Sequence, residues 1–267
     1  MKRNIPQTAS VNIRVGTSGY SFEDWRGCFY PPDIDKGKML DFYAGRFSTV
    51  EINSTYYRIP HPRVFENMVR KTSEDFDFMV KTPQSFTHRR NELGKDRQAF
   101  ADALKPLAES GRLSGLLAQF PYSFKFTPQN LDHLSICRDA VAPHPLFTEF
   151  RHISWVNRAT YDRLKAEGIG YVCVDEPELP GLLKPDCFAT TDFAYIRLHG
   201  RNAEQWWDGG ALRYDYSYSE EELQYWRDKV NKIAAKVRST YVFFNNCHMG
   251  QAVNNAAQFA AMLRHVE

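Results

Sequence analysis

Charged and amide side chains stand where short apolar runs of this sequence end. The run YIRLH ends with Arg197 and His199, and the run LFTEFR ends with Glu149 and Arg151. The matching positions of the other runs hold Glu51, Asn53, Lys81, Gln119, Asp175, Asn245 and Asn246. Arginine and lysine bind phosphate and carboxylate groups, carboxylates act as general acids or bases, and histidine changes its charge near neutral pH. These residue types could together bind and transform a small anionic molecule.

The apolar runs have the length and composition of β-strands. They are rich in β-branched and aromatic residues and occupy residues 12–18, 48–54, 76–82, 115–121, 146–152, 170–176, 194–200 and 240–246. Amphipathic segments typical of helices lie between several of them, at residues 62–71, 96–111, 157–168, 219–237 and 250–266. Strands that alternate with helices predict a parallel sheet, and about eight such repeats predict a barrel.

We therefore predict an α/β protein, a single (β/α)8 TIM barrel over residues 1–267 with a short N-terminal extension at 1–11. The alternative is an open doubly wound sheet, but no glycine-rich phosphate-binding turn follows the first run. The connections at 176–192 and 200–217 are too rich in polar residues, proline and glycine for helices. We interpret them as functional loops.

In a parallel barrel the carboxyl ends of the strands meet at one end, where this architecture places its active sites. Side chains alternate along a strand, so Glu149 and Arg151 share one face, while Phe150 faces the helices. We therefore expect the strand-end residues, Asp175 included, to converge on one polar barrel mouth. Buried unpaired charges are costly, so these groups must pair with one another, bind a ligand or stay hydrated. A salt-bridged plug without a ligand is the structural alternative.

The favoured interpretation is an enzyme that acts on a small phosphate- or carboxylate-bearing substrate by metal-independent acid/base chemistry and requires no cofactor. The candidate catalytic residues are Glu149, Asp175, His199, Lys81 and Glu51. The candidate substrate-binding residues are Asn53, Tyr56, Gln119, Arg151, Trp155, Arg197, Asn245 and Asn246. His199 could carry a proton near neutral pH. Lys81 could also form a Schiff base, because neighbouring cations lower the pKa of a lysine.

A metal-dependent hydrolase or isomerase, of the sugar-isomerase or abasic-endonuclease type, is the second interpretation. Glu149, Asp175 and His199 offer oxygen and nitrogen ligands for Mg²⁺, Mn²⁺ or Zn²⁺. Three nearby cationic side chains would repel an added divalent metal, and His199 is the only convincing histidine at a strand end. The likeness to metal-using barrels is an analogy of fold.

The third interpretation is a binding module without turnover, for nucleic acid or a glycan. Trp206 and Trp207 follow His199 in a predicted loop, and such rings could stack on bases or sugars beside Arg201 and Arg213. The sequence has 34 Lys plus Arg against 32 Asp plus Glu. This balance does not provide the basic surface typical of nucleic-acid binding, so a nucleic-acid partner is not favoured.

The five cysteines are scattered and form no CxxC pair, which is typical of reduced thiols in a cytoplasmic protein. Residues 1–15 lack the apolar stretch of a signal peptide, and no run approaches the length of a membrane span. We expect a cytoplasmic protein without a membrane partner.

Six motifs in order carry a family resemblance: VGTSGYSFEDWRGCFYPP, FYAGRFSTVEINSTYYRIP, FMVKTPQSFTH, TEFRHISW, YIRLHG and VFFNN. The chain resembles the YecE-like family, a domain of unknown function numbered 72, from about Val15 to the end of the final helix. The resemblance implies a TIM-barrel fold. It implies no particular activity and no catalytic residues.

Overall fold

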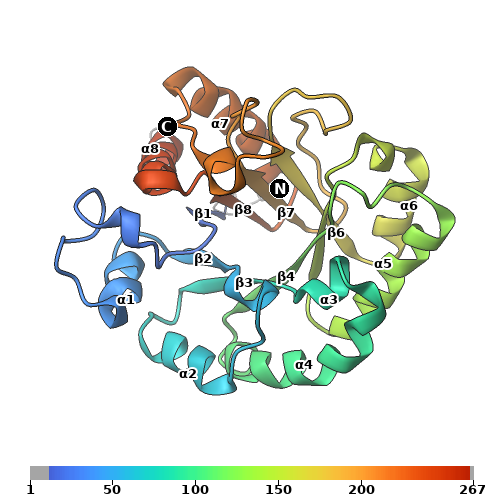
Figure 1. The fold of residues 1–267 in the computed structure, drawn as a ribbon, viewed down its shortest axis with the longest axis horizontal. Coiled ribbons are helices and arrows are strands. Elements are labelled where there is room, and N and C mark those ends of the chain that lie inside the picture. The colour runs from blue at the N-terminus through green and yellow to red at the C-terminus, as the bar shows by residue number, and fades with distance from the viewer. Residues whose placement is uncertain (1–11, 265–267) are drawn as a thin grey trace, which may run out of the picture.

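A ring of eight parallel strands lies inside a ring of helices (Figure 1), as predicted. The computed structural model describes residues 12–264, so the predicted extension at 1–11 lies outside the described residues. The strands are β1 (Ile13–Thr17), β2 (Thr49–Ile52), β3 (Asp77–Lys81), β4 (Leu113–Gln119), β5 (Leu146–Glu149), β6 (Ile169–Asp175), β7 (Phe193–Leu198) and β8 (Ser239–Phe244). Each of the eight overlaps one of the predicted runs, with bounds that differ by up to three residues. The fold is a single (β/α)8 TIM barrel.

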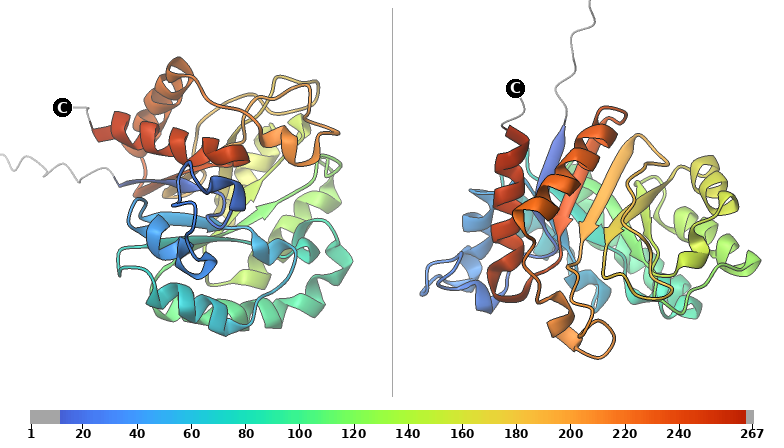
Figure 2. Two further views of the ribbon diagram at one scale, coloured as in Figure 1. Left: turned by 60° about the vertical axis from the view of Figure 1, so that its left-hand side comes forward. Right: turned by 90° about the horizontal axis from the view of Figure 1, so that it is seen from above.

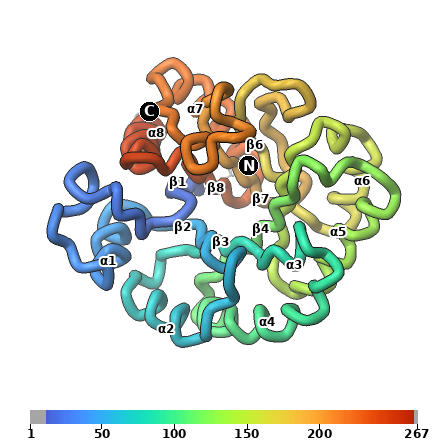
Figure 3. The backbone as a smooth tube through the Cα atoms, in the orientation of Figure 1, coloured from blue at the N-terminus to red at the C-terminus, as the bar shows by residue number. Residues whose placement is uncertain are grey.

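The chain runs once around the barrel (Figure 3), and neighbouring strands pair in the order β1-β8-β7-β6-β5-β4-β3-β2. An isolated parallel bridge between Ser18 and Glu51 brings β1 and β2 together. The helices are α1 (Met39–Ala44), α2 (Pro62–Arg70), α3 (Gln84–Thr87), α4 (Leu93–Glu109), α5 (Pro128–Val141), α6 (Arg158–Ala166), α7 (Glu220–Ala234) and α8 (Gln251–Arg264). No described helix is long and apolar enough to cross a membrane.

Local capping explains where the outer helices begin. Ser219 and Glu222 form a capping box at the start of α7, which satisfies two backbone N–H groups of its first turn. Helix α5 was not predicted, although Thr127 caps it and Pro128 occupies its first position. The segment between β6 and β7 holds no helix within the described residues, which confirms the predicted loop.

The aromatic ring of Phe147 packs the barrel interior near the amino ends of the strands. A Cβ atom at Gly115 or Gly170 would come within 2.5 or 2.2 Å of this ring, so the two glycines make room for it. Tyr195 packs edge-on against Phe147 with ring centroids 5.2 Å apart, and Phe243 packs against Tyr195 at 5.4 Å. The interior is therefore filled with side chains at this level, between the Arg14–Asp77 ion pair at the amino end and the polar groups at the carboxyl end.

Two connections, the loop after β7 and the turn after β2, lie at the carboxyl end of the barrel. The loop after β7 includes the short 3-10 helix η6 (Gly210–Tyr214) and projects beyond the strands, as the right panel of Figure 2 shows. The turn after β2 forms a second short 3-10 helix, η3 (Ser54–Tyr56).

Candidate functional site

Arg197, on β7, lies in the barrel mouth between two buried carboxylates. Its Nε and Nη2 donate to the two oxygens of Glu51 at 2.8 and 2.7 Å, and its Nη1 donates to Glu149 at 2.5 Å. Nη2 also donates to Ser18 Oγ at 3.3 Å, and the Tyr195 hydroxyl donates to Glu51. Arg197 is only 2% exposed. The prediction that Glu149 and Arg197 converge on one mouth is confirmed.

Arg151 extends this network toward the loops. Its Nη2 lies 2.7 Å from Glu149 Oε1, and its Nη1 donates to Glu176 at 2.9 Å. Burial alone would raise the pKa of Glu149, but Arg151 and Arg197 hold this pKa well below its ordinary value. Burial raises the pKa of Glu176 to about 7, against the opposing effect of Arg151. Glu149 therefore stays ionised, while Glu176 exchanges a proton near neutral pH.

The prediction that Asp175 faces the barrel mouth is wrong. In the β6–β7 register Asp175 lies beside Leu198, and both point toward the helices. The Asp175 carboxylate accepts hydrogen bonds from Arg201 Nε and Nη2, both at 2.9 Å. Its neighbour Glu176 points into the mouth in its place. Glu176 was not predicted as a site residue, because the strand alternation was not applied to the last two residues of this run.

His199 faces the mouth but is fully buried beneath its surface. Burial and the nearby Arg151 lower the pKa of His199 to about 3, so the ring stays neutral at physiological pH. This value contradicts the expected role as a proton carrier. His199 Nδ1 lies 2.8 Å from Asn245 Nδ2, and His199 Nε2 lies 3.1 Å from Arg151 Nη2 and 3.3 Å from Glu149 Oε1. His199 thus positions Asn245 and Glu149.

Lys81, at the end of β3, is half-buried and pairs with no carboxylate of the described residues. Its Nζ donates to Gln119 Oε1 at 2.8 Å and lies 4.5 Å from the centre of the Tyr56 ring. Burial lowers the pKa of Lys81 to about 7, and Arg197 adds to this effect. Lys81 therefore exchanges a proton near neutral pH, unlike the paired arginines.

Six of the predicted site residues line a cavity of about 220 Å³ at the barrel mouth, which we call the mouth cavity. Its described lining residues are Ser18, Phe22, Asn53, Tyr57, Lys81, Gln119, Arg151, Arg197, Tyr214, Asn245 and Cys247. Three of these side chains are cationic and none is a carboxylate. Asn53 Oδ1 is buried and has no hydrogen-bond partner among the described residues, so it can accept a hydrogen bond from a ligand.

Three predicted binding residues do not line this cavity: Tyr56, whose ring lies beside Lys81, and Trp155 and Asn246, which lie farther away. Trp155 is fully buried in the outer layer, where its ring stacks on Phe150 with centroids 4.2 Å apart and its Nε1 donates to the Phe124 carbonyl. Asn246 follows the inward-facing Asn245 and so points outward. It donates to the Tyr216 carbonyl and to Asn255 Oδ1 at 2.8 and 2.9 Å. Both side chains contact residues of the outer layer and do not contact the mouth cavity.

The alternative metal ligands Glu149, Asp175 and His199 do not come together, because Asp175 faces the helices. Within residues 12–264 no three His, Cys, Asp or Glu side chains are placed to hold a metal ion. The oxygens of Glu149 already contact Arg151 and Arg197. This ligand set is therefore wrong as a metal site.

The tryptophans of the β7 loop cover the mouth. Trp206 is 4% exposed, and its ring lies 5.6 Å from the guanidinium of Arg151. Trp207 is 47% exposed and packs edge-on against Tyr122.

Arg201 and Arg213 are held by Asp175 and by loop carbonyls. These arginines have structural partners, unlike the free cationic groups expected of a nucleic-acid surface.

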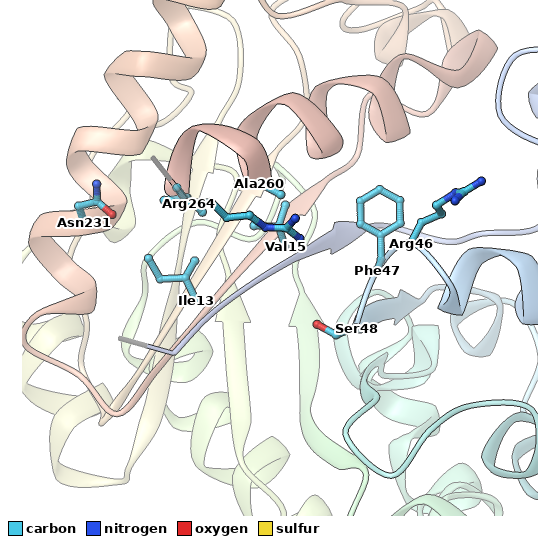
Figure 4. A pocket seen from close by; sticks show the side chains of 9 residues that line it. Ile13, Val15, Arg46, Phe47, Ser48, Asn231, Ala260 and Arg264 are labelled. Atoms are coloured by element: carbon cyan, nitrogen blue, oxygen red, sulfur yellow. The ribbon is translucent and has the colours of Figure 1, made fainter. Parts of the chain in front are cut away.

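A larger cavity, of about 510 Å³, lies at the opposite end of the barrel between the start of β1 and α8 (Figure 4). Ile13, Val15 and Phe47 line its apolar side, and Arg46 and Arg264 are exposed at its edge. No buried charged group lines it, and active sites of this architecture lie at the carboxyl ends of the strands. We therefore place the candidate site at the smaller mouth cavity.

Comparison with known proteins agrees with the fold. The family described as "Protein of unknown function DUF72" matches residues 14–267. The "UPF0759 protein YunF" of Bacillus subtilis (strain 168) is 32% identical over 269 aligned residues, which cover 94% of each protein. A crystal structure of a DUF72 family protein from Thermotoga maritima is 46% identical, with a TM-score of 0.89 over 95% of this chain and all of that one. A second, from Enterococcus faecalis, is 27% identical, with a TM-score of 0.85 over 96% of each chain.

Proposed function

Because the chain belongs to the DUF72 family, whose description assigns no activity, we propose a function from the mouth cavity itself: an enzyme that acts on a small anionic substrate by metal-independent acid/base chemistry. The observation that carries the proposal is the composition of the cavity wall. Lys81, Arg151 and Arg197 line it, and no described carboxylate does. A phosphate or carboxylate group of a ligand could accept hydrogen bonds from Lys81 and Arg151 on this wall.

The ion pairs behind the wall support a preorganised site. Glu51 and Glu149 fix Arg197 from two sides, and Glu149 and Glu176 fix Arg151. Fixed donors bind an anion without the cost of ordering long side chains on binding. Arg151 Nε has no hydrogen-bond partner among the described residues and is available to a ligand. The buried carboxylates therefore position the cations and do not contact the substrate.

Lys81 is the group best suited to proton transfer. A general acid or base works best when its pKa lies near the operating pH, and the pKa of Lys81 is lowered to about 7 by burial. Asn53 Oδ1 could accept a hydrogen bond from a substrate hydroxyl group. The three cationic side chains would repel a divalent metal ion at the same place, which supports metal-independent chemistry.

The volume of the mouth cavity limits the substrate. At about 30 Å³ per water molecule, 220 Å³ corresponds to roughly seven waters. Drug-sized ligands occupy pockets of about 300–1,000 Å³. The cavity therefore suits an acid or phosphate of a few carbon atoms, with any larger part of the molecule lying beneath exposed rim residues such as Tyr57.

Thermal shift measurements test the proposal. Inorganic phosphate, glycerol 3-phosphate, glycolate and pyruvate are titrated at constant ionic strength, with glycerol as the uncharged control. We expect a saturable rise in Tm with at least one anion and none with glycerol. Lys81→Met should lower the affinity for this anion about tenfold. Lys105→Met, which removes an exposed lysine of α4, should leave the affinity unchanged. The absence of any shift, or a shift that survives in Lys81→Met, would contradict the proposal.

A further inference from the structure

Lys81 carries the amine that lines the mouth cavity, and its placement suits a nucleophile as well as a proton carrier. We propose that Lys81 forms a Schiff base with the carbonyl group of a small anionic aldehyde or ketone. This inference rests on the proposed function, because the same cavity must first bind the anionic part of that molecule. It narrows the substrate class from small anions to carbonyl acids and phosphorylated carbonyl compounds.

The surroundings of Lys81 leave its amine free to react. No carboxylate of the described residues pairs with it, and its hydrogen bond to a side chain goes to the neutral oxygen of Gln119 at 2.8 Å. A lysine held in an ion pair would have to break that pair before attack. The amine is half-buried on the cavity wall, so it is sheltered from bulk water but accessible to a ligand.

The charges near Lys81 favour the neutral amine, which is the nucleophilic form. Burial lowers its pKa to about 7, and Arg197 and Arg151 act in the same direction, while Glu149 and Glu51 oppose them. At pH 7 about half of the amine is then neutral. For an ordinary lysine with a pKa of about 10.4 the neutral fraction is on the order of a thousandfold smaller.

The turn after β2 fixes an aromatic ring over the amine. The Thr55 hydroxyl donates to the Lys81 carbonyl, which holds η3 against the end of β3. The neighbouring Tyr56 ring then lies 4.5 Å from Lys81 Nζ. The face of an aromatic ring attracts a cation, so this ring would stabilise the positively charged iminium product as well as the ammonium group.

The step balances without an oxidant or reductant. The neutral amine adds to the carbonyl carbon, a C–N bond forms, and one amine proton passes through water to the carbonyl oxygen. A second proton, taken from solvent, converts the resulting hydroxyl group into water. The C–O bond breaks, water leaves and the protonated C=N bond forms. One proton is consumed and one water molecule is released. The iminium group can then draw electrons from a bond at the adjacent carbon.

Reductive trapping tests the inference. The full-length protein is incubated with pyruvate, glyoxylate or dihydroxyacetone phosphate and reduced with sodium cyanoborohydride, and its peptides are analysed by mass spectrometry. Dihydroxyacetone is the matched uncharged probe. We expect Lys81 to be modified at least about tenfold faster than the exposed Lys105, with a pH midpoint near 7 and with a preference for the anionic probes.

Lys81→Arg separates the inference from the proposed function, because arginine keeps the positive charge but forms no Schiff base under these conditions. We expect this variant to bind the anion in the thermal shift assay and to lose the adduct at position 81. Anion binding by the natural protein without an adduct on Lys81 would overturn the Schiff base and leave the proposed function intact. Modification of lysines in order of their exposure would also overturn it. Failure of every anion to bind would overturn both.

Discussion

The carboxylates of Asp175 and Glu176 are consecutive in the chain but lie on opposite sides of the barrel wall. Asp175 pairs with Arg201 in the helix layer, and Glu176 pairs with Arg151 in the mouth. The β6–β7 register places Asp175 beside the outward-facing Leu198. The pair offers a natural control, because the same amide substitution can be made on either side of the wall.

Glu176→Gln should change the dependence of stability on pH. Burial raises the pKa of Glu176 to about 7 in the folded protein, from an ordinary value near 4.5. A raised carboxyl pKa means that the folded state binds the proton more tightly, so its contribution to stability is present below pH 4.5 and lost as the pH rises to 7. The natural protein should therefore lose roughly 3 kcal/mol relative to Glu176→Gln over this range.

Urea denaturation at a series of pH values measures this difference. Asp175→Asn serves as the control, because it makes the same amide substitution at the neighbouring carboxylate that pairs with Arg201. A difference between the natural protein and Glu176→Gln that stays constant from pH 4 to 8 would show that Glu176 does not titrate in this range.

Anion binding should be coupled to proton uptake at Lys81. The pKa of the free Lys81 is lowered to about 7 by burial, and a bound anion stabilises its ammonium form. Affinity should therefore rise as the pH falls from 8 to 6, and binding heats should depend on the ionisation enthalpy of the buffer. Calorimetry in two buffers measures the protons taken up. Lys81→Met should lose this uptake, and a natural protein that binds the anion with no proton exchange would contradict the prediction.

We expect Arg197 to stabilise the folded protein in addition to lining the mouth cavity. Arg197→Met leaves Glu51 buried without its cation and removes one of the two cations that contact Glu149, and breaking a buried pair in this way costs about 3–5 kcal/mol. Urea denaturation measures the loss. Adding Glu51→Gln and Glu149→Gln removes the uncompensated charges, so the triple variant should be more stable than Arg197→Met alone. If the triple variant is no more stable, burial of unpaired charge is not the cause.

Trp155 should matter for stability and not for ligand binding. Its ring is fully buried against Phe150 and Phe124, so Trp155→Ala should cost about 3–5 kcal/mol of unfolding free energy. Trp155→Phe retains a ring and should cost less. Anion affinity from thermal shift should stay within about twofold in Trp155→Phe. A larger loss of affinity in this variant would restore Trp155 as a binding residue.

The barrel could be predicted because its strands are continuous apolar runs and its main helices are amphipathic. Alternation along a strand was sufficient to pair Glu149 with Arg151 and to bring Arg197 to the mouth. It was not applied to the last two residues of the sixth run, and Asp175 was placed on the wrong side. Helix α5 was missed despite Thr127 and Pro128, because its apolar face is weakly marked in sequence.

Other features of the site depend on contacts between distant segments and could not be read from local patterns. The neutral state of His199 results from burial beside Arg151, 48 residues away in the chain. The low pKa of Lys81 results from burial together with Arg197 on another strand. Trp155 follows strand β5 closely, but its short 3-10 turn, η5 (Ile153–Trp155), directs the ring into the outer layer. Such outcomes are set by tertiary packing.

The central claim is that the mouth cavity binds a small anion through Lys81 and Arg151. A crystal of the protein soaked in sodium selenate tests it directly, because selenium can be located by its anomalous scattering. We expect an anomalous peak inside the cavity, with selenate oxygens at about 3 Å from Lys81 Nζ and from a nitrogen of Arg151. A cavity without selenate, in a crystal that binds selenate at exterior lysines only, would show that the mouth cavity is not an anion site.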